Sequence, residues 1–268
     1  MKKQDEFLTV LLVEVPFFVL GKGELCQVIE LQCSLVFLKE LSELKNYQIK
    51  TYEEAIQVIE EVGLLPLAPL VPDFPALNTI TTPESWHSDT EYDPWIWRTR
   101  FSVDGVAGYG KFIKKKSILI SRDFLPYFKV VIGHDETVED RYQKGHVSRE
   151  ALNLYRIIRE EGVIDTRELR TRAGLRDKEH KKVFDNGILE LQGAMDIVIS
   201  GIKEKINAEG EKNGWSSTFF ETYDSWASRN KIASIAVDKG RAREYIVNHF
   251  RGFATDKAFQ KLQKILGE

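Results

Sequence analysis

Residues 86–98 of the chain concentrate side chains that could do chemistry. The stretch WHSDTEYDPWIWR holds three tryptophans, one histidine, three carboxylates and an arginine. In an extended segment alternate residues share a face, so His87, Asp89, Glu91 and Asp93 could in principle face a metal ion together. Their spacing matches no specific metal signature, and we expect no metal here.

The three tryptophans favour two interpretations. Tryptophan side chains bury a large apolar area while the indole N–H seeks a partner, which predicts first an aromatic anchor. Second, the same rings could stack on an extruded base or another ligand, with Arg98 or Arg100 on its phosphate. The candidate pocket residues are Trp86, His87, Asp93, Trp95, Trp97 and Arg98.

Positive charge gathers directly after this stretch. Residues 96–132 contain eight lysines and arginines against two aspartates, a local excess of six. Apolar runs flank the triplet Lys114, Lys115 and Lys116, which predicts a hairpin with a cationic tip. Such a tip could meet phosphates, because lysine acts as a point charge; the alternative is an ordinary solvated turn.

Composition limits the remaining possibilities. The chain has 268 residues, 43% of them hydrophobic, and a net charge of −3, so nucleic-acid affinity would have to come from local patches. Cys26 and Cys33 match neither a Cys-x-x-Cys metal pair nor a disulfide framework, which predicts a reduced, cytoplasmic protein. The apolar run at residues 7–20 is interrupted by Glu14 and Pro16 and is too short to span a bilayer.

Patterning divides the chain into five segments. Residues 1–46 are an extension that either packs on the next domain or precedes the biological start. Residues 47–132 predict a mixed α/β domain, in which Thr51 and Glu54 form a helix capping box and Gly63 ends that helix. Residues 133–147 are polar and aperiodic, which predicts a linker. Residues 225–268 predict C-terminal helices.

Residues 148–224 give the clearest order of elements. An apolar helical stripe is followed by the short strand VID, a second helix, a third helix that buries Phe184, Ile188 and Leu191, and two strands of a hairpin. Helix, strand, helix, helix and hairpin is the order of a winged helix-turn-helix, whose third helix enters the major groove. We therefore expect an α+β fold built around a winged helix.

The runs YRIIREEGVIDTRELRTRAGL, FDNGILELQGAMDIVISG and GWSSTFFETYDSW, with the upstream WHSDTEYDPWIWR, resemble the AlkZ-related branch of the winged-helix DNA glycosylases of the AlkZ and YcaQ type. The resemblance implies DNA binding through tandem winged helices. In the true glycosylases it also implies base excision by a Gln-x-Asp motif, which does not occur in this sequence. Gln192 and Asp196 have the wrong spacing for that role.

The expected function is therefore DNA binding, with a role in repair and with glycosylase activity as the enzymatic class if any bond is broken. The alternative is a non-catalytic protein-interaction or regulatory module, because charges on the third helix sum to zero. A weaker third idea is a hydrolase that uses the acidic cluster. DNA is the expected partner, with a protein or a second copy as the alternative, and no cofactor or membrane is expected. The candidate nucleic-acid contacts are Arg167, Arg170, Lys178, Lys181, Lys182, Lys203, Lys205, Lys114, Lys115 and Lys116.

Overall fold

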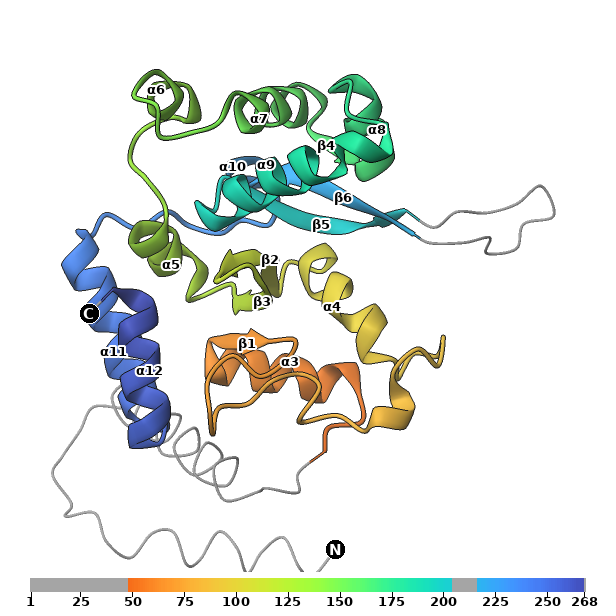
Figure 1. The fold of residues 1–268 in the computed structure, drawn as a ribbon. Helices are drawn as coiled ribbons and strands as arrows, with labels where there is room; N and C mark the ends of the chain where they lie inside the picture. The colour runs from red at the N-terminus through yellow and green to blue at the C-terminus, as the bar shows by residue number, and fades with distance from the viewer. Residues whose placement is uncertain (1–47, 204–215, 268) are drawn as a thin grey trace, which may run out of the picture.

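Two three-stranded antiparallel sheets organise the chain in a computed structural model that describes residues 48–203 and 216–267 (Figure 1). The first sheet has the order β1 (Leu64–Pro66), β3 (Lys116–Ser121) and β2 (Ala107–Ile113), and the second the order β4 (Val163–Asp165), β6 (Ser217–Thr222) and β5 (Ile197–Lys203). The expectations for residues 1–46 and for Lys205 lie outside the described residues.

The elements before the second sheet follow local sequence signals. They are α3 (Tyr52–Val62), β1 (Leu64–Pro66), η1 (Pro83–Ser85), α4 (Pro94–Val103), β2 (Ala107–Ile113), β3 (Lys116–Ser121) and α5 (Leu125–Ile132). The capping box of Thr51 and Glu54 is present, and Gly63 ends α3 with a φ of 75°, so both predictions are confirmed. The expected hairpin is β2–β3, with Ile113 opposite Lys116 across the turn.

The second half has the element order read from the sequence. Its members are α7 (Arg149–Glu161), β4 (Val163–Asp165), α8 (Thr166–Arg172), η2 (Lys178–His180), α9 (Lys181–Gly193), β5 (Ile197–Lys203) and β6 (Ser217–Thr222). Phe184, Ile188 and Leu191 of α9 are buried as predicted. The described structure is thus a mixed α and β protein with small antiparallel sheets.

The segment between these halves is not the unstructured linker that its polarity suggests. It contains helix α6 (Val138–Gln143), which begins at the capping side chain of Thr137. Val138 is buried, and so is Arg141, whose guanidinium reaches Asp196 at the start of β5. A partner 55 residues away in the sequence explains why a charged, aperiodic stretch is ordered here.

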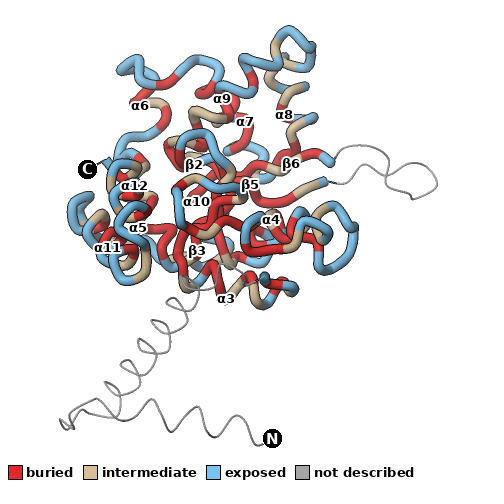
Figure 2. The backbone as a smooth tube through the Cα atoms, turned by 60° about the horizontal axis from the view of Figure 1, so that its bottom comes forward, coloured by how far each residue is buried: buried red, intermediate tan, exposed pale blue. Residues whose placement is uncertain are grey.

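One hydrophobic core runs through both halves. Figure 2 shows buried backbone continuing between the two sheets, and β2 packs beside β5 and α9. Trp226 of α10 (Tyr223–Arg229) is fully buried and donates its indole N–H to the carbonyl of Ser102 at 2.9 Å. The two sheets are therefore held in a fixed relation by shared packing.

The C-terminal helices, α11 (Lys239–Arg251) and α12 (Asp256–Leu266), pack on the N-terminal half. Helix α11 lies against α5 (Figure 1). The ring centroids of Phe250 in α11 and Phe74 are 5.8 Å apart. The prediction of two terminal helices is confirmed. Within residues 48–203 and 216–267, no helix is long and apolar enough to cross a membrane.

Candidate functional site

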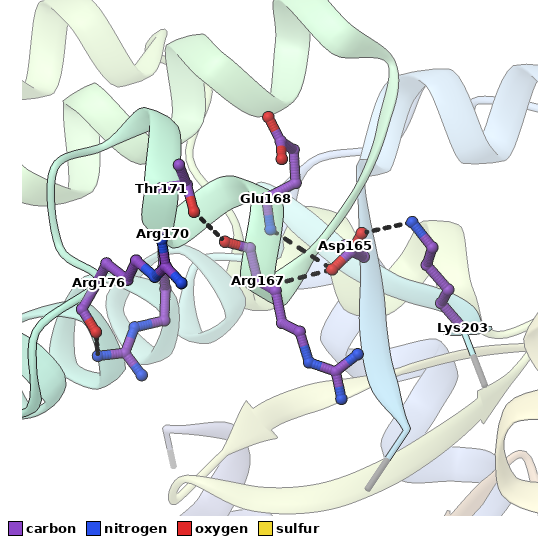
Figure 3. Close-up of a pocket in the computed structure, with 7 residues that line it drawn as sticks. All are labelled: Asp165, Arg167, Glu168, Arg170, Thr171, Arg176 and Lys203. Carbon is purple, nitrogen blue, oxygen red and sulfur yellow. Dashed lines mark hydrogen bonds and ion pairs between the residues drawn. The ribbon is translucent and has the colours of Figure 1, made fainter. Parts of the chain in front are cut away.

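A basic pocket of about 460 Å³ opens where α8 meets the end of β5 (Figure 3). Four cationic and two acidic side chains border it, so the pocket carries a net positive charge. Its lining residues are Asp165, Arg167, Glu168, Arg170, Thr171, Arg176 and Lys203. Guanidinium and ammonium groups that border an open pocket favour an anion such as phosphate.

Asp165 organises this pocket from within. Its carboxylate caps α8 by accepting the backbone N–H of Arg167 at 2.9 Å, and it accepts the Ser217 hydroxyl at 2.8 Å. Lys203 Nζ lies 3.2 Å from the same carboxylate. Burial works to raise the pKa of Asp165, but the hydrogen bonds from Ser217, Lys203 and the backbone outweigh it and hold the pKa below its usual value. Asp165 is therefore ionised at neutral pH and anchors Lys203.

Arg170 has a mainly structural part in the pocket wall. Its Nε donates to the carbonyl of Leu175 at 2.9 Å, and its Nη2 donates to the carbonyls of Arg176 and Asp177 at 3.2 and 3.0 Å. These bonds close the turn between α8 and η2. Because Asp177 directly precedes Lys178, they also fix the start of η2 against the pocket.

Three lysines among the candidate nucleic-acid contacts open the next helical segment. Lys178 begins η2, Lys181 and Lys182 begin α9, and all three are exposed. Lys181 Nζ lies 3.9 Å from Asp185, so one acidic residue of the helix offsets this charge. Glu190 is directed elsewhere, because its carboxylate accepts the backbone N–H and hydroxyl of Ser148. Lys178 and Lys182 make no ion pair with any described residue.

The tryptophan-rich stretch is built around Asp93. This carboxylate is 1% exposed, caps α4 and accepts the backbone N–H of His87, Asp89 and Trp95 at 3.0, 3.2 and 2.8 Å. His87 and Asp89 have φ values of 61° and 54°, in the left-handed region that non-glycine residues rarely adopt. The bonds to Asp93 hold these two strained residues in place, which gives the carboxylate a structural role.

The three tryptophans do not gather in one pocket. Trp97 is 1% exposed and donates its indole N–H to the carbonyl of Glu91 at 2.7 Å. Trp86 is partly buried and donates to the hydroxyl of Thr81 at 2.9 Å. Trp95 is exposed, with the guanidinium carbon of Arg98 3.4 Å from its ring centroid and the His87 ring 4.9 Å away.

Gln192 and Asp196 are both engaged in packing. The Gln192 Oε1 accepts the backbone N–H of Lys111 at 2.6 Å, and Asp196 is bound by Arg141. Gln192 is 1% exposed and the Asp196 side chain is 9% exposed, so both are largely removed from solvent. Among the described residues, no cluster of three histidine, cysteine, aspartate or glutamate side chains could hold a metal ion.

The sequence-predicted contacts fall into separate places. Arg167, Arg170 and Lys203 border the pocket, Lys178, Lys181 and Lys182 follow it, and Lys114, Lys115 and Lys116 lie on the β2–β3 hairpin. Four lining residues of the pocket are absent from the sequence candidates: Asp165, Glu168, Thr171 and Arg176. Arg176 could have been found from its position directly after Gly174 and Leu175. The predicted helix ends at Gly174, and the chain then turns back on α8, where Arg170 binds the Leu175 carbonyl.

A family model described as "AlkZ related" matches residues 49–267 of the chain. Among solved structures, the Streptomyces sahachiroi DNA glycosylase AlkZ matches with a TM-score of 0.44 and 12% identity. That alignment covers 87% of this chain and 64% of the AlkZ chain, so the chain spans less than two thirds of that protein. No curated protein matches the sequence.

Proposed function

The chain belongs to the AlkZ-related family, and from this premise we propose that residues 148–224 form a winged helix that binds the phosphate backbone of duplex DNA. Element order supports the proposal, because helix α7, strand β4, helices α8 and α9, and the strands β5 and β6 follow the winged-helix sequence. The sheet order β4-β6-β5 is consistent with it.

The observation that carries the proposal is the position of the pocket cations beside the lysines of η2 and α9. Arg170 joins the two regions through its bond to the Asp177 carbonyl. The pocket cations therefore lie beside three lysines called here the η2–α9 lysines, Lys178, Lys181 and Lys182. Lysine and arginine contacts to phosphates release counterions and provide sequence-independent affinity. A basic surface of this kind fits a nucleic-acid backbone better than a small neutral ligand.

Base excision is not part of the proposed function. Base excision needs a group that directs water at the sugar, and the Gln192 and Asp196 side chains are held by Lys111 and Arg141 instead. The chemistry of the AlkZ-type Gln-x-Asp motif therefore does not transfer to these two residues.

Fluorescence anisotropy of a labelled duplex across a potassium chloride series tests the proposal. The triple variant K178A/K181A/K182A removes three charges from the η2–α9 surface. We expect at least a tenfold loss of affinity at low salt and a log–log salt slope shallower by about 3, roughly one unit for each phosphate contact. Mismatched and alkylated duplexes in parallel would show whether a lesion adds affinity.

A matched control removes three lysines from α12. K257A/K261A/K264A makes the same change in net charge on a different helix, where all three side chains are exposed. The control should bind like the wild-type protein. Equal weakening of both triple variants, or no binding by the wild type at low salt, would refute the proposal.

A non-catalytic interaction module is the second candidate function. It is favoured by the internal partners of three expected DNA contacts, since Arg170, Lys181 and Lys203 bind the carbonyls after α8, Asp185 and Asp165. The same titration separates the two functions. If the wild type fails to bind DNA, this second candidate takes precedence.

A further inference from the structure

We infer that the tip of the β2–β3 hairpin is a second phosphate-binding element that contacts the same duplex as the η2–α9 surface. This inference rests on the proposed DNA-binding function. It concerns four lysines that the hairpin carries, Lys111, Lys114, Lys115 and Lys116, called here the hairpin lysines.

The hairpin lysines are uncompensated. All four are exposed, and none makes an ion pair within the described part of the chain. No aspartate or glutamate occurs between residues 105 and 122, so the sequence offers no acidic neighbour along the hairpin. Adjacent like charges repel one another, and a bound polyanion would relieve that repulsion.

Two of these lysines lie on strained backbone at the turn. Lys114 and Lys115 have φ values of 49° and 59°, the left-handed pair required by a type I′ hairpin turn. Asparagine and glycine are the residues that favour these angles, whereas lysine adopts them at a cost in free energy. Strained backbone of this kind is typical of functional positions, where the side chain matters more than stability.

Buried neighbours fix the tip in place. Phe112 and Ile113 are 3% and 7% exposed and anchor β2 just before the turn. The backbone N–H of Lys111 is bound at 2.6 Å by Gln192, which is itself 1% exposed. The tip is therefore a rigid feature joined to the last turn of α9.

The same helix connects the two basic regions. Lys181 opens α9 and Gln192 lies near its end, and eleven residues correspond to about 16 Å of helix length and about three full turns. Gln192 lies on the buried stripe of α9 with Phe184 and Ile188, so the bond to Lys111 joins the hairpin to the helix through the core. The η2–α9 lysines lie at the start of α9 and the hairpin is bound near its end, so the two basic regions are spaced along one helix, which suits contacts to separate phosphates of one polyanion.

The double variant K114N/K115G tests the inference without disturbing the turn. Asn-Gly is the favoured type I′ pair, so the variant should fold with an unchanged or higher Tm, by about 2 to 4 °C. We expect its affinity for duplex DNA at low salt to fall on the order of tenfold and its salt slope to become shallower by about 2. K261A/K264A on α12 is the control of equal charge and should bind normally.

The outcomes separate this inference from the proposal on which it rests. Normal binding by K114N/K115G, together with weakened binding by K178A/K181A/K182A, would overturn the hairpin contact and leave the winged-helix contact standing. Weakened binding in both variants but not in K261A/K264A would support both. A wild-type protein that binds no DNA would overturn both.

Discussion

The Nη2 atom of Arg141 lies 2.7 Å from both carboxylate oxygens of Asp196. The Arg141 side chain is 4% exposed and that of Asp196 9% exposed, so this ion pair is almost removed from water. Lys129 adds a bond to the carbonyl of Met195 at 2.8 Å. Helices α5 and α6 are in this way fastened to the start of β5, beside the last turn of α9.

Removing one member of this pair should destabilise the protein strongly. In Arg141→Met the Asp196 carboxylate stays buried without its main partner, which costs about 3–5 kcal/mol in buried pairs. Burial already raises the pKa of Asp196, and Arg141 and Lys129 counter that effect only in part. Urea unfolding would measure the loss. The double variant R141M/D196N should recover much of it, and a loss below about 1 kcal/mol in R141M would contradict the role given to the pair.

Replacing Asp93 should lower the free energy of unfolding, because this carboxylate holds the tryptophan-rich stretch together. In Asp93→Ala, α4 loses its N-cap and the backbone N–H groups of His87 and Asp89 lose their acceptor. A helix N-cap contributes about 0.5–2 kcal/mol, and we expect about 2 kcal/mol here because three donors share one carboxylate. Chemical denaturation followed by tryptophan fluorescence would report it.

Two variants sharpen that comparison. Asp93→Asn keeps one acceptor oxygen and should lose less stability than the alanine variant. Glu84→Ala removes an exposed carboxylate from the neighbouring η1 and should change little. Equal effects of E84A and D93A would indicate that net charge, rather than the hydrogen bonds of Asp93, supports the loop.

Gly187 sets how closely α9 approaches α7. A Cβ atom at this position would lie 2.8 Å from Leu154 Cδ1 and 3.4 Å from the Ala151 backbone nitrogen, and both residues are buried. Gly187→Ala should therefore push the helices apart and cost about 1–3 kcal/mol. Differential scanning calorimetry would measure the lower Tm.

Gly193, in the same helix, provides the internal control. A Cβ there meets nothing within 4 Å, so Gly193→Ala should be neutral or stabilise the helix by up to about 1 kcal/mol. If both alanine variants lost the same stability, the loss in Gly187→Ala could not be assigned to the contact between α9 and α7, and the backbone freedom of glycine would explain both losses. Under the proposed function, Gly187→Ala should also weaken DNA binding because it displaces α9, whereas Gly193→Ala should not.

Features fixed by neighbouring residues can be predicted from the sequence. The capping box of Thr51 and Glu54, the end of α3 at Gly63, and the buried stripe of α9 all depend on contacts within a few residues. The cationic hairpin was also predictable, since apolar runs flank a short polar turn. Family membership followed from longer runs of the same local patterns.

Contacts between distant residues could not be predicted. The bond from Lys111 to Gln192 spans 81 residues and that from Trp226 to Ser102 spans 124, and neither leaves a periodic signal. For the same reason α6 resembled a linker: the partner that buries Arg141 is Asp196, on another element. The basic pocket likewise depends on a strand end, a helix and a following turn that meet only in the fold.

His249 should make the protein less stable as pH falls. Its ring lies tilted against that of Phe124 with the centroids 4.4 Å apart, and its Nε2 is buried without a hydrogen-bond partner in the described structure. Burial lowers the pKa of His249 below its usual 6.5, and hydrogen bonding to the backbone of Val62 and Glu61 offsets only part of that effect. The unfolded chain then takes up the proton first, so stability is complete above about pH 6.5 and is lost as pH falls below it.

Unfolding free energies between pH 5.5 and 7.5 would measure this dependence. His249→Phe keeps an aromatic ring among Phe124, Phe250 and Phe253 and removes the proton site, so it should lose up to about 1 kcal/mol less than the wild type over that range. His134 is more exposed, and its pKa is also lowered, first by burial and then by Arg141, so His134→Gln should show the same sign with a smaller effect. The variant has no proton site at position 249. If it kept the full wild-type pH dependence, the group that takes up the proton would lie elsewhere in the protein.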